Sequence, residues 1–360
     1  MSARSVTAFL VAAATTACAP SAAPPSASSS SPLDRASRDT SPATAPLPNQ
    51  PFAEYSGWLA YQTCDSCSSE LDTEIHLVRG DGTDDHVILG ELAGRKAHPD
   101  FSPDGSRLAF DNLASFDDAD VTYVAAADGS EPVLAAPCQP PDCVQLWEPA
   151  WSPDGTRIAA ALARNGSAAG PERFGIAIIE LASEQVTAIV EHPAADGQDH
   201  FPRWSPEGDR LVFWRGQPTA TGVQTAIFVV NTDGSGLEQL TEWADNAGDP
   251  DWSPDGSLIV YGTYPLLEFR SGTSELFTIR PDGTGVEQLT AFGPEGPRAT
   301  QPRWTPDGSA ILYTRTTQAG SPRTLWVVSA DGQADQSVFA ESARGIYTHP
   351  VMQPVGGASN

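Results

Sequence analysis

One ten-residue pattern recurs five times along this chain and constrains its fold more than any other feature. Each copy begins with an aromatic residue, continues through Ser or Thr, Pro, Asp or Glu, and Gly, and ends in a short apolar run. The copies begin at Phe101, Trp151, Trp204, Trp252 and Trp304, so they are 50, 53, 48 and 52 residues apart. A regular spacing of this length indicates structural units of one kind.

Each copy has the chemistry of a β-turn between two strands. Pro presets the backbone at the first central position, Asp closes the turn with its side chain, and Gly accepts a conformation that other residues resist. The flanking runs are rich in Val, Ile, Leu, Phe and Tyr, which favour strands. Further Asp-Gly turns stand at 127–129, 232–234, 281–283 and 330–332. Four short strands fit in each unit, which predicts an all-β fold, a β-propeller.

The two ends of the chain are expected to share one blade. Residues 349–354 resemble 98–103 in outline, and strand-like runs that could complete that blade lie at 57–61, 74–78 and 87–89. Residues 51–356 number 306, or six units of 51. We therefore predict a six-bladed β-propeller whose last blade is closed by strands from both termini, which removes free sheet edges.

The aromatic residue that opens each repeat is expected to lie in the core, where one large ring per blade interlocks adjacent sheets. Each ring would bury roughly 150–250 Å². The Asp-Gly turns are not expected to bind calcium, which needs several oxygen ligands at alternate positions of one loop. These repeated residues are therefore interpreted as structural.

The repeat resembles that of a known family. The aromatic-Ser-Pro-Asp-Gly motif, together with Asp-Gly-x-Gly-x-Glu-Gln-Leu-Thr at 233–241 and its counterpart at 282–290, is similar to the WD40-like (PD40) repeat of TolB-like β-propellers. The resemblance covers nearly all of 51–356 and implies the propeller fold. TolB carries a globular domain before its propeller, and this chain has a Ser/Pro-rich stretch there. The resemblance therefore implies a propeller-only lipoprotein and does not carry over TolB's partners.

The N-terminus resembles a bacterial lipoprotein signal. Arg4 precedes an apolar stretch, and small residues lead to Cys18, the expected lipidation site. An ordinary secretory signal is the alternative, because Thr15 stands where a large aliphatic residue is usual. Residues 19–50 are dominated by Ala, Ser, Pro and Thr, which predicts a flexible tether. The expected organisation is thus 1–18 signal peptide, 19–50 disordered tether and 51–360 propeller, facing the periplasm or the cell exterior.

Composition excludes some partners. The chain has 46 acidic and 20 basic side chains and a formal net charge of −26, which would repel nucleic acid. The single lysine, Lys96, means that any positive site must be built from Arg. The N-terminal apolar run is too short to span a bilayer. We therefore expect membrane attachment only through the lipid.

Long connections are expected on the face opposite the Pro-Asp-Gly turns, where function usually resides. Their aromatic and Arg side chains suit recognition of a protein or a glycan. A solvated rim of mixed charge is the alternative. The candidate binding residues are Trp147, Trp243, Tyr264, Arg270, Arg298 and Tyr347.

A second candidate site lies three residues before the first residue of each repeat. These positions should surround one mouth of the central channel, and they are His98, Glu148, Phe201, Asp249, Gln301 and His349. Two His and one carboxylate can form an open metal face. We therefore treat His98, Glu148 and His349 as candidate ligands of a divalent metal, and expect no other cofactor. A polar channel mouth with strand-end caps is the alternative.

Four cysteines follow Cys18 in an exported chain, which favours two disulfides. The candidates are Cys64, Cys67, Cys138 and Cys143. Local pairing is the simplest connectivity, and cross-pairing between the two loops stays open. A redox role for Cys64 and Cys67 is disfavoured, because no strand-helix unit is expected there to lower a thiol pKa. A four-thiolate zinc site is disfavoured in an oxidising compartment.

The sequence favours a non-enzymatic role. It has no Gly-x-Ser-x-Gly nucleophile motif. The leading hypothesis is a lipid-anchored propeller that acts as a protein-interaction scaffold in the bacterial cell envelope, with another envelope protein or cell-wall glycan as its partner. The alternatives are a metalloenzyme, a lyase or hydrolase with a channel-mouth metal, a glycan-binding module and a periplasmic small-ligand sensor.

Overall fold

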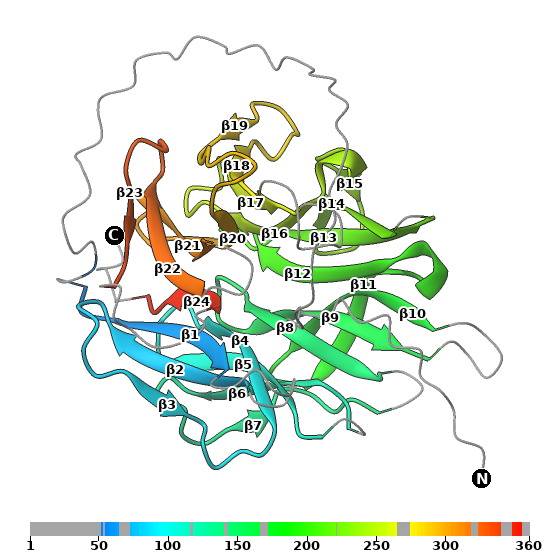
Figure 1. The fold of residues 1–360 in the computed structure, drawn as a ribbon. Helices are drawn as coiled ribbons and strands as arrows, with labels where there is room; N and C mark the ends of the chain where they lie inside the picture. The colour runs from blue at the N-terminus through cyan, green and yellow to red at the C-terminus, as the bar shows by residue number, and fades with distance from the viewer. Residues whose placement is uncertain are drawn as a thin grey trace, which may run out of the picture. The chain divides into compact units, whose positions relative to one another are not determined.

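Six four-stranded antiparallel sheets make up the described part of the chain (Figure 1). The computed structural model describes residues 52, 55–64, 73–115, 118–139, 143–165, 172–220, 222–264, 274–317, 323–339 and 348–354. The chain divides into two units, residues 1–46 and 47–360, and every described residue belongs to the second. We number the sheets as blades 1 to 6 in chain order.

The first three blades take their strands as follows. Blade 1 contains β24 (Thr348–Met352), β1 (Trp58–Cys64), β2 (Thr73–Arg79) and β3 (His86–Ile88). Blade 2 contains β4 (Arg95–Phe101), β5 (Arg107–Leu113), β6 (Val121–Ala126) and β7 (Val133–Leu134). Blade 3 contains β8 (Gln145–Trp151), β9 (Arg157–Arg164), β10 (Arg173–Glu180) and β11 (Gln185–Pro193).

The other three blades follow the same order. Blade 4 contains β12 (Gln198–Trp204), β13 (Arg210–Thr219), β14 (Gly222–Asn231) and β15 (Glu238–Gln239). Blade 5 contains β16 (Ala247–Trp252), β17 (Ile259–Thr263), β18 (Leu276–Ile279) and β19 (Glu287–Gln288). Blade 6 contains β20 (Arg298–Trp304), β21 (Ala310–Thr316), β22 (Arg323–Ser329) and β23 (Asp335–Ser337).

Helical structure in this part of the chain consists of two three-residue 3-10 turns, η1 (Ala194–Asp196) and η2 (Trp243–Asp245). Within the described residues, no helix has the length and apolar character needed to cross a membrane.

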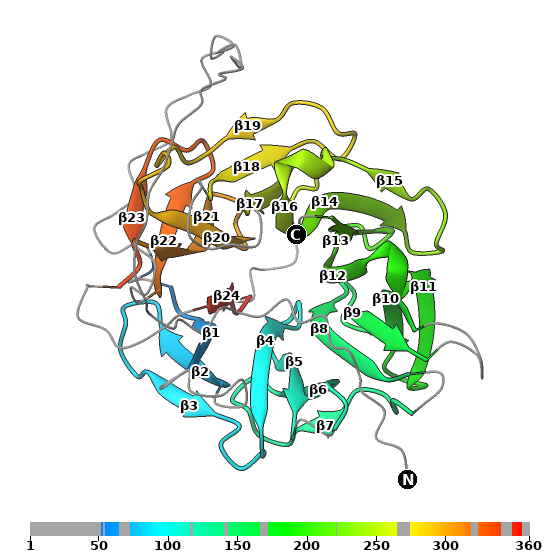
Figure 2. The same ribbon diagram turned by 45° about the vertical axis from the view of Figure 1, so that its right-hand side comes forward.

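The ring closes through strands from both ends of the described chain, as predicted. Strand β24 pairs with β1, so that Met352 lies opposite Leu59 and Val351 opposite Ala60. The Gln353 amide donates to the carbonyl oxygen of Trp58 at 2.8 Å, and the Trp58 amide donates to Oε1 of Gln353 at 3.1 Å. Figure 2 shows β24, β4, β8, β12, β16 and β20 as the innermost strands of the six sheets. The predicted six-bladed all-β propeller is confirmed.

The repeated Ser-Pro-Asp-Gly segments are hairpin turns stabilised by their own side chains. In blade 2, Oγ of Ser102 accepts from the Arg107 amide at 2.9 Å and donates to Asp104 at 2.6 Å. Asp104 also accepts from the Ser106 amide at 3.0 Å. The hydrogen bonds from Ser102 and Ser106 lower the pKa of Asp104 to about 2. Gly105 has φ of 70°, a conformation that favours glycine.

Tryptophan opens four of the five repeats, and three of these rings, Trp151, Trp204 and Trp252, are buried where they interlock neighbouring blades. Trp204 is buried in a cluster that includes Ala159 and Ile176 of blade 3 and Leu211 of blade 4. The Arg157 guanidinium lies 4.6 Å from the Trp204 ring centroid, a cation–π contact. The same contact joins Arg107 to Trp151 and Arg210 to Trp252. The core role predicted for these rings is therefore confirmed, and each Arg extends it to the next blade.

Candidate functional site in the central channel

Six residues with left-handed backbone surround the channel. Their φ angles lie between 49° and 58°, and they are His98, Glu148, Phe201, Asp249, Gln301 and His349. Other residues than glycine seldom adopt this conformation. The pairing register of each innermost strand shifts at or beside this residue, so each is a β-bulge. We call these six residues the bulge ring.

Side chains from the preceding blade stabilise most of the bulge ring. For five of the six residues, the backbone amide donates to such a side chain. The pairs are His98 to Gln62 Oε1 at 3.1 Å, Glu148 to Asp111 Oδ1 at 3.1 Å, Phe201 to Glu148 Oε2 at 2.9 Å, Gln301 to Tyr264 Oη at 3.4 Å and His349 to Gln301 Oε1 at 3.2 Å. Strained backbone persists only where its surroundings fix it, and these bonds between blades do so.

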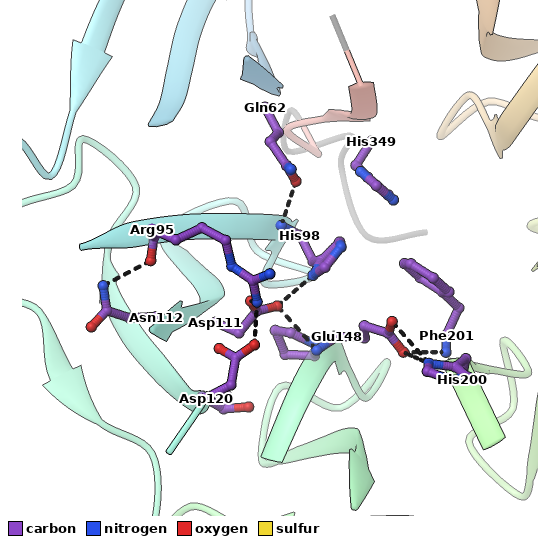
Figure 3. A network of polar contacts seen from close by, with 12 residues as sticks. Gln62, Arg95, His98, Asp111, Asn112, Asp120, Glu148, His200, Phe201 and His349 are labelled. Carbon is purple, nitrogen blue, oxygen red and sulfur yellow. Dashed lines mark hydrogen bonds and ion pairs between the residues drawn. The ribbon is translucent and has the colours of Figure 1, made fainter. Parts of the chain in front are cut away.

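Three rings of the bulge ring meet at the channel axis. The centroids of His98 and Phe201 are 5.1 Å apart, those of His98 and His349 are 4.5 Å apart, and those of Phe201 and His349 are 5.3 Å apart. The rings come from blades 2, 4 and 1, and Figure 3 shows them facing one another. Because the rings from blades 1 and 2 contact the ring from blade 4, side chains meet across the channel at this level. We call these three rings the aromatic plug.

The three predicted metal ligands have separate partners. Nδ1 of His98 lies 2.6 Å from Oδ1 of Asp111. The Glu148 carboxylate lies 3.1 Å from Nδ1 of His200, in the next blade (Figure 3). Nε2 of His349 lies 3.0 Å from Nε2 of Gln301. Among the described residues, no group of three or more His, Cys, Asp or Glu side chains is placed to hold a metal ion. The structure thus does not assemble His98, Glu148 and His349 as one ligand set.

Burial and neighbouring charges shift the pKa values of three groups at or beside the bulge ring. Asp111 is fully buried, and burial raises its pKa, but the adjacent His98 and Arg95 hold the pKa below its usual value. Burial and the nearby Asp111 raise the pKa of Asp120, which also pairs with Arg95, well above its usual value. Burial and the nearby His98 lower the pKa of His349 well below the ordinary histidine value. These buried groups are paired inside the protein.

A cavity of about 190 Å³ occupies the channel beyond the aromatic plug. Its charged lining residues, Asp100, Arg203, Asp251 and Arg303, each directly precede the first residue of a repeat. Its other lining residues are Ala150, Trp151, Pro153, Trp204, Ser205, Pro206, Trp304, Val351 and Met352. Because several of these belong to the Ser-Pro turns, the cavity lies at the turn end of the channel. We call it the charged cavity.

The carboxylates of the charged cavity are fixed by the neighbouring blade. Oδ2 of Asp100 accepts from the Trp151 amide at 2.7 Å, and Oδ2 of Asp251 accepts from the Trp304 amide at 2.8 Å. Burial raises the pKa of Asp100 to about 6 and that of Asp251 to about 7, although Arg203 opposes both shifts. Both pKa values therefore lie above the usual range of a carboxyl group.

The two arginines of the charged cavity form no hydrogen bond to a carboxylate of the described residues. Nη1 of Arg203 donates to the carbonyl oxygens of Pro202 at 2.8 Å and Pro149 at 3.3 Å. Arg203 is only 5% exposed, and its Nε has no hydrogen-bond partner among the described residues. Nη1 of Arg303 lies 3.8 Å from Oδ1 of Asp251, beyond hydrogen-bonding distance. Among the described residues, neither guanidinium is therefore paired with a carboxylate through a hydrogen bond.

Of the residues predicted for the loop face, the structure describes four, and one of these, Trp147, is buried. Trp147 is 9% exposed and packs against Phe174 and neighbouring alanines. The Tyr264 hydroxyl donates to Asp249 of the bulge ring. Trp147 is therefore a buried packing residue and not the exposed contact that was predicted, whereas Tyr264 is half-buried. Trp243 is half-buried against Phe228, with ring centroids 5.7 Å apart.

The remaining predicted residues are placed as follows. Arg298 is half-buried at the start of β20, whereas Arg270 and Tyr347 lie outside the described residues. Cys138 and Cys143 form a disulfide, as local pairing predicted. Cys18, Cys67 and the side chain of Cys64 lie outside the described part of the chain.

The sequence carries a signal for the charged cavity at the position directly before each repeat. In blade order from blade 2, these positions hold Asp100, Ala150, Arg203, Asp251, Arg303 and Val351. Side chains two apart on a strand lie on one face, so these positions share the channel side with the bulge ring. Four of these six inward positions carry a charge, which indicates a polar site. Metal ligands were predicted only at the positions two residues earlier, so this site was not predicted from the sequence.

The fold and the channel define a six-bladed propeller with a closed axis and a charged cavity at its turn end. Residues 144–355 match the family described as PD40, the TolB beta propeller domain. Because this match spans more than half of the chain, the protein belongs to that family.

Two curated relatives are similar in sequence. Uncharacterized protein Atu1656 of Agrobacterium fabrum (strain C58) is 28% identical over 229 residues, which cover 59% of this chain and 68% of that protein. The uncharacterized peptidase YuxL of Bacillus subtilis (strain 168) is 27% identical over 117 residues, which cover 32% of this chain and 17% of the peptidase. The second match therefore spans only a small part of that protein.

Two solved structures share the fold. TolB from Acinetobacter baumannii superposes with a TM-score of 0.62 at 18% identity and covers 83% of this chain and 67% of its own. A putative TolB from Agrobacterium tumefaciens has a TM-score of 0.51 at 20% identity and covers 73% of this chain and 98% of its own. At these identities the likeness concerns the fold alone.

Proposed function

We propose that this protein is an exported, lipid-anchored β-propeller that acts as a protein-interaction scaffold in the bacterial cell envelope. The charged cavity is the observation that supports this most. Its walls are formed by Trp151, Trp204, Trp304 and prolines, and its charges come from two Arg and two Asp. Aromatic and Arg side chains are enriched at the energetic centres of protein interfaces. We propose that a short segment of a partner protein inserts there.

Rigidity also supports a scaffold role. The innermost strands that line the cavity are joined to the next blade by the Asp100–Trp151 and Asp251–Trp304 hydrogen bonds. The cation–π contact between Arg157 and Trp204 adds a further link between blades. A site held in this way loses little conformational freedom when a partner binds, which favours affinity. The turn end of the channel, rather than the loop face, is therefore the proposed contact surface.

The envelope location rests on the N-terminal sequence. The segment that ends at Cys18 resembles a lipoprotein signal, and 19–50 has the composition of a tether. Metabolic labelling with an alkyne fatty acid tests this part of the proposal. The wild type should incorporate label and sediment with membranes, whereas Cys18→Ser should do neither. A wild type that is exported but never labelled would contradict lipid anchoring and favour a secretory signal.

Site-specific photo-crosslinking in intact cells tests the scaffold role. A crosslinking amino acid at Pro153, on the exposed rim of the charged cavity, should yield a discrete protein adduct at native expression level. The matched control is Glu238, which is exposed on the outer strand β15 and should yield none. Adducts at Glu238 alone would contradict the proposed surface. If neither position crosslinks to protein while purified cell-wall glycan binds, the protein-scaffold role is wrong.

A further inference from the structure

We propose that the charged cavity captures a carboxylate of the partner segment between Arg203 and Arg303, and that capture is coupled to uptake of one proton by Asp251. The inference rests on the proposed function for the origin of the ligand. The chemistry of capture follows from the cavity itself. The ligand is captured without any covalent change. The proton comes from solvent and adds to the Asp251 carboxylate.

The order of charges around the channel places one acid between two bases. Blade 4 contributes Arg203, blade 5 contributes Asp251 and blade 6 contributes Arg303. Asp100 lies in blade 2, and the inward positions of blades 3 and 1 are the uncharged Ala150 and Val351. The positive groups are therefore concentrated on one side of the cavity, on either side of Asp251.

Both arginines have hydrogen-bonding capacity to spare. Arg203 is held by backbone carbonyls, and its buried Nε has no partner among the described residues. Arg303 is 12% exposed in its side chain and approaches Asp251 only to 3.8 Å. A planar guanidinium matches a carboxylate through paired, charge-assisted hydrogen bonds. A ligand carboxylate would supply the acceptor that the cavity lacks.

Asp251 supplies the coupling. Asp251 is near three charged residues, which are Arg203 of β12, Arg303 of β20 and Asp100 of β4. Its Oδ2 accepts a hydrogen bond from the Trp304 backbone amide. With both Asp ionised, the four side chains carry no net charge, whereas protonating Asp251 leaves a net positive charge. A carboxylate placed beside Asp251 disfavours its ionised form. Since the pKa of Asp251 is already about 7, ligand binding takes up at most about half a proton at pH 7 and approaches one proton at pH 8.

The carboxylate could be a chain terminus or an Asp or Glu side chain of the partner. Isothermal titration calorimetry with three peptides separates these sources: acetyl-Ala-Leu-Ala with a free carboxylate, the same peptide amidated, and acetyl-Ala-Glu-Ala-amide. We expect at least one carboxylate peptide to bind about tenfold more tightly than the neutral amide, as one charge-assisted interaction allows. Equal binding of all three, or of none, overturns the inference.

Proton uptake is measured by repeating the titration in two buffers of different ionisation enthalpy. Affinity should fall by about tenfold from pH 6 to pH 8, because only the form with protonated Asp251 binds tightly. Asp251→Asn mimics that form, so the variant should bind at pH 8 nearly as the wild type does at pH 6, with proton uptake reduced to the part that Asp100 contributes. Affinity that does not vary with pH overturns the coupling.

Arg303→Gln tests the anion contact and should abolish carboxylate-dependent binding. The matched control is Arg280→Gln, which removes an exposed Arg outside the cavity and should bind as the wild type does. Thermal unfolding of each variant verifies that it folds. If Pro153 still crosslinks to a protein when peptide binding has failed, this inference falls and the scaffold role stands. If proton-coupled peptide binding occurs without any envelope crosslink, the inference stands and the scaffold role falls.

Discussion

The bulge ring and the charged cavity lie two residues apart on the same innermost strands, yet their polar groups are used differently. In the bulge ring, Asp111 serves His98, Arg95 and the Glu148 amide at once, and the aromatic plug fills the axis. In the charged cavity, Arg203 and Arg303 lack a hydrogen-bonded carboxylate partner among the described residues. The comparison teaches that inward charges paired with one another hold neighbouring blades together, whereas Arg203 and Arg303, which lack a hydrogen-bonded carboxylate among the described residues, are the groups we propose for a ligand.

The largest expected effect comes from breaking the bulge ring. Asp111→Ala should lower the free energy of unfolding by about 3–5 kcal/mol, because it leaves His98 and the Glu148 amide without their acceptor and removes one of the two carboxylates that pair with Arg95. Urea unfolding measures the change. Glu238→Ala, an exposed carboxylate on β15, is the control and should stay within about 0.5 kcal/mol of the wild type. A similar small change for Asp111→Ala would contradict the structural role of the ring.

The free energy of unfolding should depend on pH because Asp251, in the charged cavity, has a raised pKa. The folded pKa of Asp251 is about 7 against 3.8 for the ordinary group, so between these values the folded state binds more protons than the unfolded state. Its contribution to stability is therefore lost as pH rises from 5 to 8, by about 1–3 kcal/mol. Unfolding free energies at pH 5, 6.5 and 8 should show a flatter profile for Asp251→Asn.

A turn carboxylate provides the control for this prediction. The pKa of Asp104 is lowered to about 2, so Asp104 stays ionised in both states across pH 5 to 8. Asp104→Asn should shift stability without changing its slope over that range. A wild-type profile that Asp251→Asn leaves unaltered would show that the cavity carboxyl titrates normally.

Removing one ring of the aromatic plug should have a smaller effect on stability and a clear effect on access. Phe201 is half-buried and contacts His98 and His349, so Phe201→Ala should cost about 1–2 kcal/mol, less than a fully buried phenylalanine. Opening the axis should speed modification of His98 and His349 by diethyl pyrocarbonate, read by mass spectrometry. Phe201→Leu should retain most of the protection. Unchanged rates in the alanine variant would mean that the rings do not control access.

The smallest effect is expected in the cavity. Arg303→Gln should change the free energy of unfolding by less than about 1 kcal/mol at pH 7, because its 3.8 Å contact with Asp251 is not a hydrogen bond. The same denaturation series measures it beside Asp111→Ala. If Arg303→Gln lowered the free energy of unfolding as much as Asp111→Ala does, Arg303 would be a structural residue. The contrast between the bulge ring and the charged cavity would then be wrong.

The repeat by itself determined the architecture of this protein. Pro, Asp and Gly at fixed places define turns through local backbone preferences, and the spacing of the repeats and strand-like runs at both ends yielded six blades and their closure. The local disulfide between Cys138 and Cys143 was also within reach, because five residues of chain keep the two thiols close. These features depend on short-range chemistry that a sequence displays directly.

Only the tertiary structure decided what the inward side chains do. Asp111 caps Glu148 from the second strand of another blade, and His98, Phe201 and His349 meet although they come from three different blades. The repeat pattern could align Arg203 with Asp251, but not show which donors stay unpaired or how far burial raises a carboxyl pKa. Such properties depend on distances between strands far apart in the chain, which are fixed when the blades close into a ring.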